Sequence, residues 1–177
     1  RGHEVVHVGA GPLPHGLAAS NDISKAVRAA YGADEDYTAL AEQAIKIWRE
    51  WNEEFGTTLY HQVGVMFVRR SEMTPGDFEY ESFKLLQTRG VKVARMNTPQ
   101  LWKRFPAWNP ELYRDGVLEI EAGYAESGRA VAALIDRAKS LGVQLQAGKF
   151  AGLDESAGRG KGIGLGGVQR SGRAAWR

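Results

Sequence analysis

Strand-type and helix-type patterns alternate along most of this chain, and that alternation is the strongest constraint on its fold. Apolar side chains recur every three or four residues from Asp36 to Phe55 and again from Ser127 to Leu141, which predicts two amphipathic helices. Shorter helices are expected at 22–31, at 75–88 and from Thr98 to just before Pro106, and strands at 3–8, 59–68, 91–94, 117–120 and 143–145, with an Asp115–Gly116 turn. Strands interleaved with helices indicate an α/β (α+β) fold that combines a mixed sheet with covering helices.

Charge and glycine are distributed unevenly between the body of the chain and its end. The net charge of the 177 residues is only +2, yet the segment from Ser156 onward contains five basic residues, no acidic residue and seven of the 22 glycines. Residues 151–177 are therefore expected to be a disordered tail, either a genuine extension or the product of a shifted reading frame. Arg-Gly segments can bind RNA or an acidic partner, which keeps such binding open as an alternative function.

Several classes of protein are excluded by composition. The chain has no cysteine, which excludes disulfides and thiolate chemistry, and its four histidines lack metal-ligand spacing, so no metal site is expected. No apolar run reaches the ~20 residues that a membrane-spanning helix needs. The first residues lack the order of a secretory signal, and we expect a cytoplasmic location.

The opening strand can be interpreted in two ways within a dinucleotide-binding fold. In the first, it is the second strand of a Rossmann unit, which ends beside the adenosine ribose. In the second, it is the first strand, and Gly9, Ala10 and Gly11 begin a phosphate loop. That loop must lead directly into a helix, and Pro12 and Pro14 disfavour a helix there. The first interpretation is therefore preferred.

Motifs in family order along residues 2–150 resemble the FAD-dependent amine oxidase family, which includes sarcosine, fructosyl-amino-acid and pipecolate oxidases. The longest is Ala18-Ala19-Ser20-Asn21-Asp22-Ile23-Ser24-Lys25 followed by Arg28 and Tyr31-Gly32; the others are Gly2–Val6, Gly11–His15, Tyr60–Met66 and Gly123–Gly128. The resemblance implies oxidation of a secondary-amine C–N bond in a small amine or N-substituted amino acid. FAD would take the hydride equivalents, and oxygen would reoxidise the flavin and yield hydrogen peroxide.

The resemblance also implies which residues meet the cofactor. The implied FAD-binding residues are Gly11, Ser20, Asn21, Asp22, Lys25 and Arg28. Lys25 is the implied catalytic residue, because its ammonium would stabilise the negative charge that develops on reduced flavin. On the expected helix, Arg28 would share one face with Lys25.

The same resemblance divides the chain into four parts. Residues 1–34 would be the remnant of the FAD-binding domain, 35–122 a portion of the substrate domain, 123–150 the return helix and strand, and 151–177 the tail. In the family, a glycine-rich phosphate loop precedes the segment that begins here and further sheet follows it, so we expect a fragment without full activity. Uncovered sheet edges would then favour self-association, and a non-catalytic interaction fragment is the alternative.

Overall fold

The computed structural model of the chain describes residues 2–109, 111–150 and 168–169, and it divides into two compact units. Unit 1 comprises residues 1–23 and 127–177, and unit 2 comprises residues 24–126. Each unit is described by itself below. The expectations for the tail fall outside the described residues, except at Val168–Gln169.

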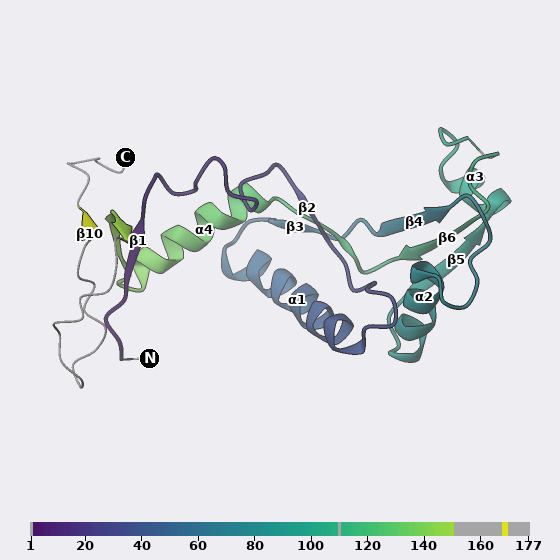
Figure 1. The fold of residues 1–177 in the computed structure, drawn as a ribbon, viewed down its shortest axis with the longest axis horizontal. Coiled ribbons are helices and arrows are strands. Elements are labelled where there is room, and N and C mark those ends of the chain that lie inside the picture. Colours follow the sequence, from purple (N-terminus) through teal and green to yellow (C-terminus); the bar gives the residue numbers. More distant parts are fainter. Residues whose placement is uncertain (1, 110, 151–167, 170–177) are drawn as a thin grey trace. The chain divides into compact units, whose positions relative to one another are not determined.

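Unit 1 is built on a parallel strand pair. The strand β1 (Val6–Gly9) pairs with β8 (Gln144–Ala147), and the helix α4 (Ser127–Ser140) leads into β8 (Figure 1). A parallel pair needs a crossover connection, typically with a helix. This arrangement agrees with the expected α/β class. The short strands β9 (Lys149–Phe150) and β10 (Val168–Gln169) pair with each other in antiparallel fashion.

Unit 2 contains two antiparallel three-stranded sheets joined by continuous chain. One has the order β2 (Lys25–Val27), β7 (Gly123–Ala125), β3 (Tyr60–His61), and the other has the order β4 (Val65–Arg69), β6 (Asp115–Glu119), β5 (Val93–Asn97). The consecutive strands β3 and β4 pair with β7 and β6, respectively, as Figure 1 shows. The expected single strand 59–68 is thus divided into β3 and β4. The division is at Gly64, whose φ of 84° is a conformation that favours glycine.

Three helices complete unit 2: α1 (Glu35–Glu54), α2 (Phe78–Thr88) and α3 (Thr98–Arg104). The predicted long helix is confirmed as α1, and Asp34 caps it by accepting a hydrogen bond from the Tyr37 N–H. The short helix expected from Thr98 is confirmed as α3, which begins with a capping box of Asn97 and Gln100. The helix expected from residue 75 begins only at Phe78, because the Asp77 carboxylate closes a turn with Thr74.

The core of unit 2 lies between α1, α2 and the sheets. Its buried members are Ala29, Ala30, Ile45, Tyr60 and Leu86. The Asn52 side chain ties the end of α1 to β3, since it accepts hydrogen bonds from the Leu59 and Tyr60 N–H groups and donates to the Tyr60 carbonyl. Across the described residues, no helix is both long and apolar enough to cross a membrane.

Two local predictions are wrong. Residues 22–31 do not form a helix, because Lys25–Val27 pairs with β7 and the N–H groups of Ala29 and Ala30 bind a side chain elsewhere in unit 2. Those interactions use backbone groups that a helix would need for itself. The expected turn at Asp115–Gly116 is instead the beginning of β6, flanked on both sides by strands.

Candidate functional site

The segment that follows β2 is fixed by a buried carboxylate. Glu119, on the central strand β6, is fully buried and accepts hydrogen bonds from the Ala29 N–H at 2.7 Å and the Ala30 N–H at 3.0 Å. A carboxylate that accepts two backbone hydrogen bonds holds both donors in one geometry. Glu119 therefore sets the path of the chain immediately after Arg28.

Burial raises the pKa of Glu119 above its ordinary value, since removal from water disfavours the charged form. The hydrogen bonds from Ala29 and Ala30 and the positive charge of Arg28 oppose that shift. The carboxylate and the Arg28 guanidinium thus interact electrostatically across the same short segment.

Arg28 is surrounded by aromatic rings. Its guanidinium carbon lies 4.3 Å from the centre of the Tyr31 ring, 5.5 Å from that of Phe67 and 5.7 Å from that of Phe78. It also donates a hydrogen bond to the Ala30 carbonyl. Stacking on aromatic faces stabilises a guanidinium without neutralising it, so the site retains a positive charge at a fixed position.

Arg28 borders an open groove of about 420 Å³ between the segment at β2 and α1. The lining is mainly apolar and aromatic: Ala26, Val27, Tyr31, Tyr37, Leu40, Ala41, Ala44 and Trp48, with Arg28 as the charged member. Trp48 also packs against the buried core, with its ring centre 6.4 Å from that of Tyr60. The arrangement suits a flat apolar group that carries negative charge at one end.

Lys25 and Arg28 do not lie on a common helix, contrary to the expectation: Lys25 begins β2, and Arg28 follows the end of that strand. Lys25 is exposed on β2 and pairs in register with Ala125. Lys25 is not among the residues that line the groove beside Arg28.

The other four implied cofactor residues belong to unit 1. Gly11 lies in the loop after β1, where a Cβ would approach the His15 ring to 2.9 Å. Ser20, Asn21 and Asp22 lie in the exposed loop before β2. The Asp22 carbonyl accepts hydrogen bonds from the Ser127 hydroxyl and the Gly128 N–H at the start of α4. The start of α4 therefore holds Asp22 in place.

Glu119 and the His61–Glu126 pair were not among the residues expected from the sequence. His61 Nε2 lies 2.7 Å from a Glu126 carboxylate oxygen, and the His61 ring stacks on Tyr124 with 4.6 Å between the ring centres. A signal for Glu119 was present, since an acidic residue interrupts the apolar run Val117–Ile120. An acid in the middle of a buried strand must find donors inside the fold.

Comparisons with known proteins agree with this architecture. The model of a family described as FAD dependent oxidoreductase matches residues 1–175. L-saccharopine oxidase of Schizosaccharomyces pombe is 28% identical over 156 residues, which is 82% of this chain and 35% of that protein. Human peroxisomal sarcosine oxidase is 27% identical over 134 residues, 73% of this chain and 32% of that protein. The chain thus spans about one third of the length of these curated relatives.

Solved structures show the same fold. Glycine oxidase from Geobacillus kaustophilus superposes with a TM-score of 0.74 at 18% identity, covering 86% of this chain and 42% of that one. L-proline dehydrogenase from P. horikoshii gives the same TM-score at 17% identity, covering 86% and 40%. From the family match over nearly its whole length, the chain belongs to the FAD-dependent oxidoreductase family.

Proposed function

We propose that the protein to which this chain belongs oxidises the C–N bond of a small amine or N-substituted amino acid. The family match over residues 1–175 carries the proposal, and relatives named as sarcosine and N-methyl-L-tryptophan oxidases support the substrate class. The CH–NH unit would lose two electrons and two protons to become C=N. Bound FAD would supply the redox chemistry, and molecular oxygen would accept the electrons as hydrogen peroxide.

The groove beside Arg28 fits part of such a cofactor or its substrate. Its apolar and aromatic lining can cover a planar ring, and the guanidinium supplies a positive charge where a carboxylate or an electron-rich ring edge would lie. The hydrogen bonds that Glu119 accepts from the Ala29 and Ala30 N–H groups keep that charge in position before any ligand arrives.

The remaining residues enter the proposal with the roles that the resemblance implies. Lys25 would stabilise negative charge on the reduced flavin, and Gly11, Ser20, Asn21 and Asp22 would contact the cofactor. Hydroxyl, amide and ammonium groups are suitable partners for the polyol, phosphate and carbonyl oxygens of FAD.

Location and assembly complete the proposal. A cytoplasmic location is proposed because the chain has no cysteine and tolerates a reducing compartment; cell fractionation tests it, and one named relative is peroxisomal. Self-association through uncovered strand edges is proposed on the physics of exposed sheet edges, and its test is sedimentation of the purified chain.

A titration of the purified chain with FAD tests the cofactor site directly. We expect the chain to quench flavin fluorescence, and Arg28→Gln to weaken FAD binding by about tenfold, the effect of losing one charge-assisted contact. Arg70→Gln is the matched control, because Arg70 is exposed at the end of β4 and lies outside the groove. Unchanged binding in Arg28→Gln would remove Arg28 from the cofactor site.

Substrate class is tested separately by following peroxide with the FAD-loaded protein and sarcosine or N-methyl-L-tryptophan. We expect this chain alone to oxidise these substrates slowly or not at all, because it spans only about one third of the length of its curated relatives. Rapid peroxide formation by the chain would contradict the fragment interpretation while supporting the reaction.

A further inference from the structure

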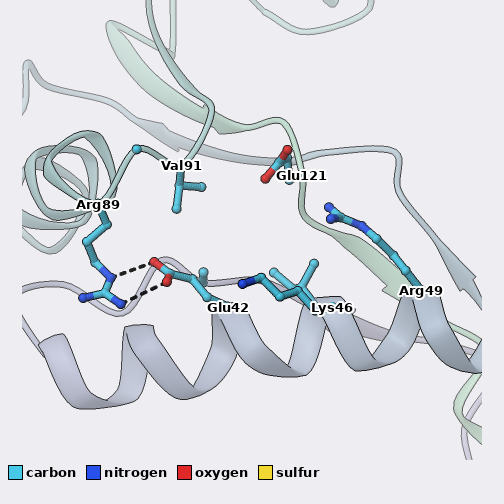
Figure 2. A pocket seen from close by; sticks show the side chains of 9 residues that line it. Glu42, Lys46, Arg49, Arg89, Val91 and Glu121 are labelled. Carbon is cyan, nitrogen blue, oxygen red and sulfur yellow. Dashed lines mark hydrogen bonds and ion pairs between the residues drawn. The ribbon is translucent and has the colours of Figure 1, made fainter.

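A second cavity in unit 2 lies on another side of α1, between that helix and the turn after α2 (Figure 2). Its volume is about 180 Å³, the scale of a small metabolite rather than a nucleotide. The lining comprises Ala29, Glu42, Ile45, Lys46, Arg49, Arg89, Gly90, Val91 and Glu121. Five of these nine residues are charged, in contrast to the apolar groove beside Arg28.

Both acidic residues of this cavity already have basic partners. Glu42 receives a two-pronged interaction from Arg89, with N–O distances of 2.7 and 3.0 Å, drawn as dashed lines in Figure 2. Glu121 lies 3.5 Å from the Lys92 ammonium. A two-pronged arginine–carboxylate pair satisfies the geometry of both groups, so Glu42 and Arg89 largely cancel each other's charge.

Two cations of the cavity remain without such partners. Within the described residues, neither Lys46 nor Arg49 makes a hydrogen bond or an ion pair. They are three positions apart on α1, which places them on one face of the helix. In Figure 2 the Arg49 side chain rises from α1 toward Glu121, while the Lys46 side chain extends toward Glu42.

The Arg49 side chain gives a second, independent indication. Its Nε atom is buried and has no hydrogen-bond acceptor among the described residues. A buried donor without an acceptor is costly, and most native structures provide one. An oxyanion held between Lys46 and Arg49 would supply an acceptor to the guanidinium and a counter-charge to both cations.

We propose that this cavity binds a small dianion, either a phosphate or a short dicarboxylate, between Lys46 and Arg49. The two ligand classes share the oxygen chemistry that a guanidinium and an ammonium recognise. Because the cavity opens to solvent and contains Glu121, binding is weak and decreases with salt. The site is independent of the proposed oxidation, and its test uses no flavin.

Calorimetric titration of the purified chain with inorganic phosphate and, in parallel, with succinate tests the site at low ionic strength. We expect one of the two probes to bind, and Arg49→Gln to weaken that binding by about tenfold. Lys46→Gln should act in the same direction. Glu121→Gln should strengthen binding, because it removes a negative charge from the cavity without disturbing the backbone carbonyl that accepts the Tyr60 hydroxyl hydrogen bond.

Arg70→Gln also removes one arginine charge, but outside the cavity, and should leave binding of the probe unchanged. Unfolding midpoints of all variants establish that each remains folded, and Arg49→Lys retains the charge should the glutamine variant unfold. If neither probe binds, or if Arg70→Gln weakens binding as much as Arg49→Gln, the site is overturned. Binding that is stronger in Glu121→Gln and weaker in Arg49→Gln supports it.

Discussion

Replacing Glu119 with alanine is expected to reduce the free energy of unfolding by about 3–5 kcal/mol, because it leaves two buried N–H groups without acceptors and a void in the core. Glu119 is 0% exposed, and its two oxygens serve the Ala29 and Ala30 N–H groups. Urea denaturation at neutral pH measures the effect. Because the Arg28 segment loses its anchor, FAD binding should fall as well.

Glu119→Gln separates hydrogen bonding from charge. Glutamine retains one acceptor and cannot ionise, so its cost should be smaller than that of alanine. The wild-type pKa is raised above the ordinary value of 4.5, so the folded chain binds more protons than the unfolded chain at pH values between the two. The free energy of unfolding of the wild-type chain therefore falls as pH rises through this window. The difference in free energy of unfolding between wild type and Glu119→Gln should accordingly become smaller as pH rises.

Glu50→Ala is the control for the alanine substitution, since Glu50 is exposed on α1. It should leave stability and its pH dependence nearly unchanged. A Glu119→Ala protein as stable as the Glu50→Ala protein would contradict the anchoring role.

Gly123→Ala is expected to destabilise the chain by about 3 kcal/mol, since rigid backbone must move to accommodate the added methyl group. A Cβ at this position of β7 would overlap the His61 carbonyl oxygen of the neighbouring strand β3 and lie 2.8 Å from the His61 carbonyl carbon. Both strands would have to separate, which also disturbs the His61–Glu126 pair. Thermal unfolding followed by circular dichroism measures the loss.

Gly16→Ala is the matched control, because a Cβ there would meet no atom within 4 Å. It should be neutral or slightly stabilising through the unfolded chain. If the Gly123→Ala protein unfolds at the same temperature as the Gly16→Ala protein, the close approach of β3 and β7 does not constrain this fold.

Helices were the most predictable part of the molecule. The helix expected over 36–55 is α1, and the one expected over 127–141 is α4, within a residue or two at each end. Their periodic apolar stripes span several turns, and a signal of that length outweighs local variation. The family resemblance and the α/β fold are likewise confirmed by the family match and the structural neighbours.

The failures share a physical cause, namely partners distant in sequence. Residues 22–31 contain helix-favouring alanines, yet β7 and Glu119 lie about 90 or more positions away and bind their backbone. Asp115–Gly116 has turn chemistry, but Asp115 instead accepts hydrogen bonds from Arg95, on the neighbouring strand β5, and from the Met73 N–H in the loop after β4. Local propensity cannot anticipate bonds that form only when the sheet assembles.

The candidate site was likewise predictable in its residue types and unpredictable in the contacts that come from distant parts of the chain. Its residue types were visible in the sequence, including Arg28, whereas the aromatic surroundings of that cation come from β4 and α2. The assignments of Gly11, Ser20, Asn21, Asp22 and Lys25 stay predictions. The Lys46–Arg49 cavity gave no motif at all, because its acidic and basic members come from three separate segments.

Unit 2 begins and ends at neighbouring points. Asp22, just before its first residue, is hydrogen-bonded to Ser127, just after its last, and inside the unit Lys25 pairs with Ala125. When the two ends of an inserted segment lie close together, joining it to the surrounding chain costs little conformational entropy. Residues 24–126 can therefore be exchanged between members of the family as one cassette, with the Asp22–Ser127 hydrogen bond kept at its two ends.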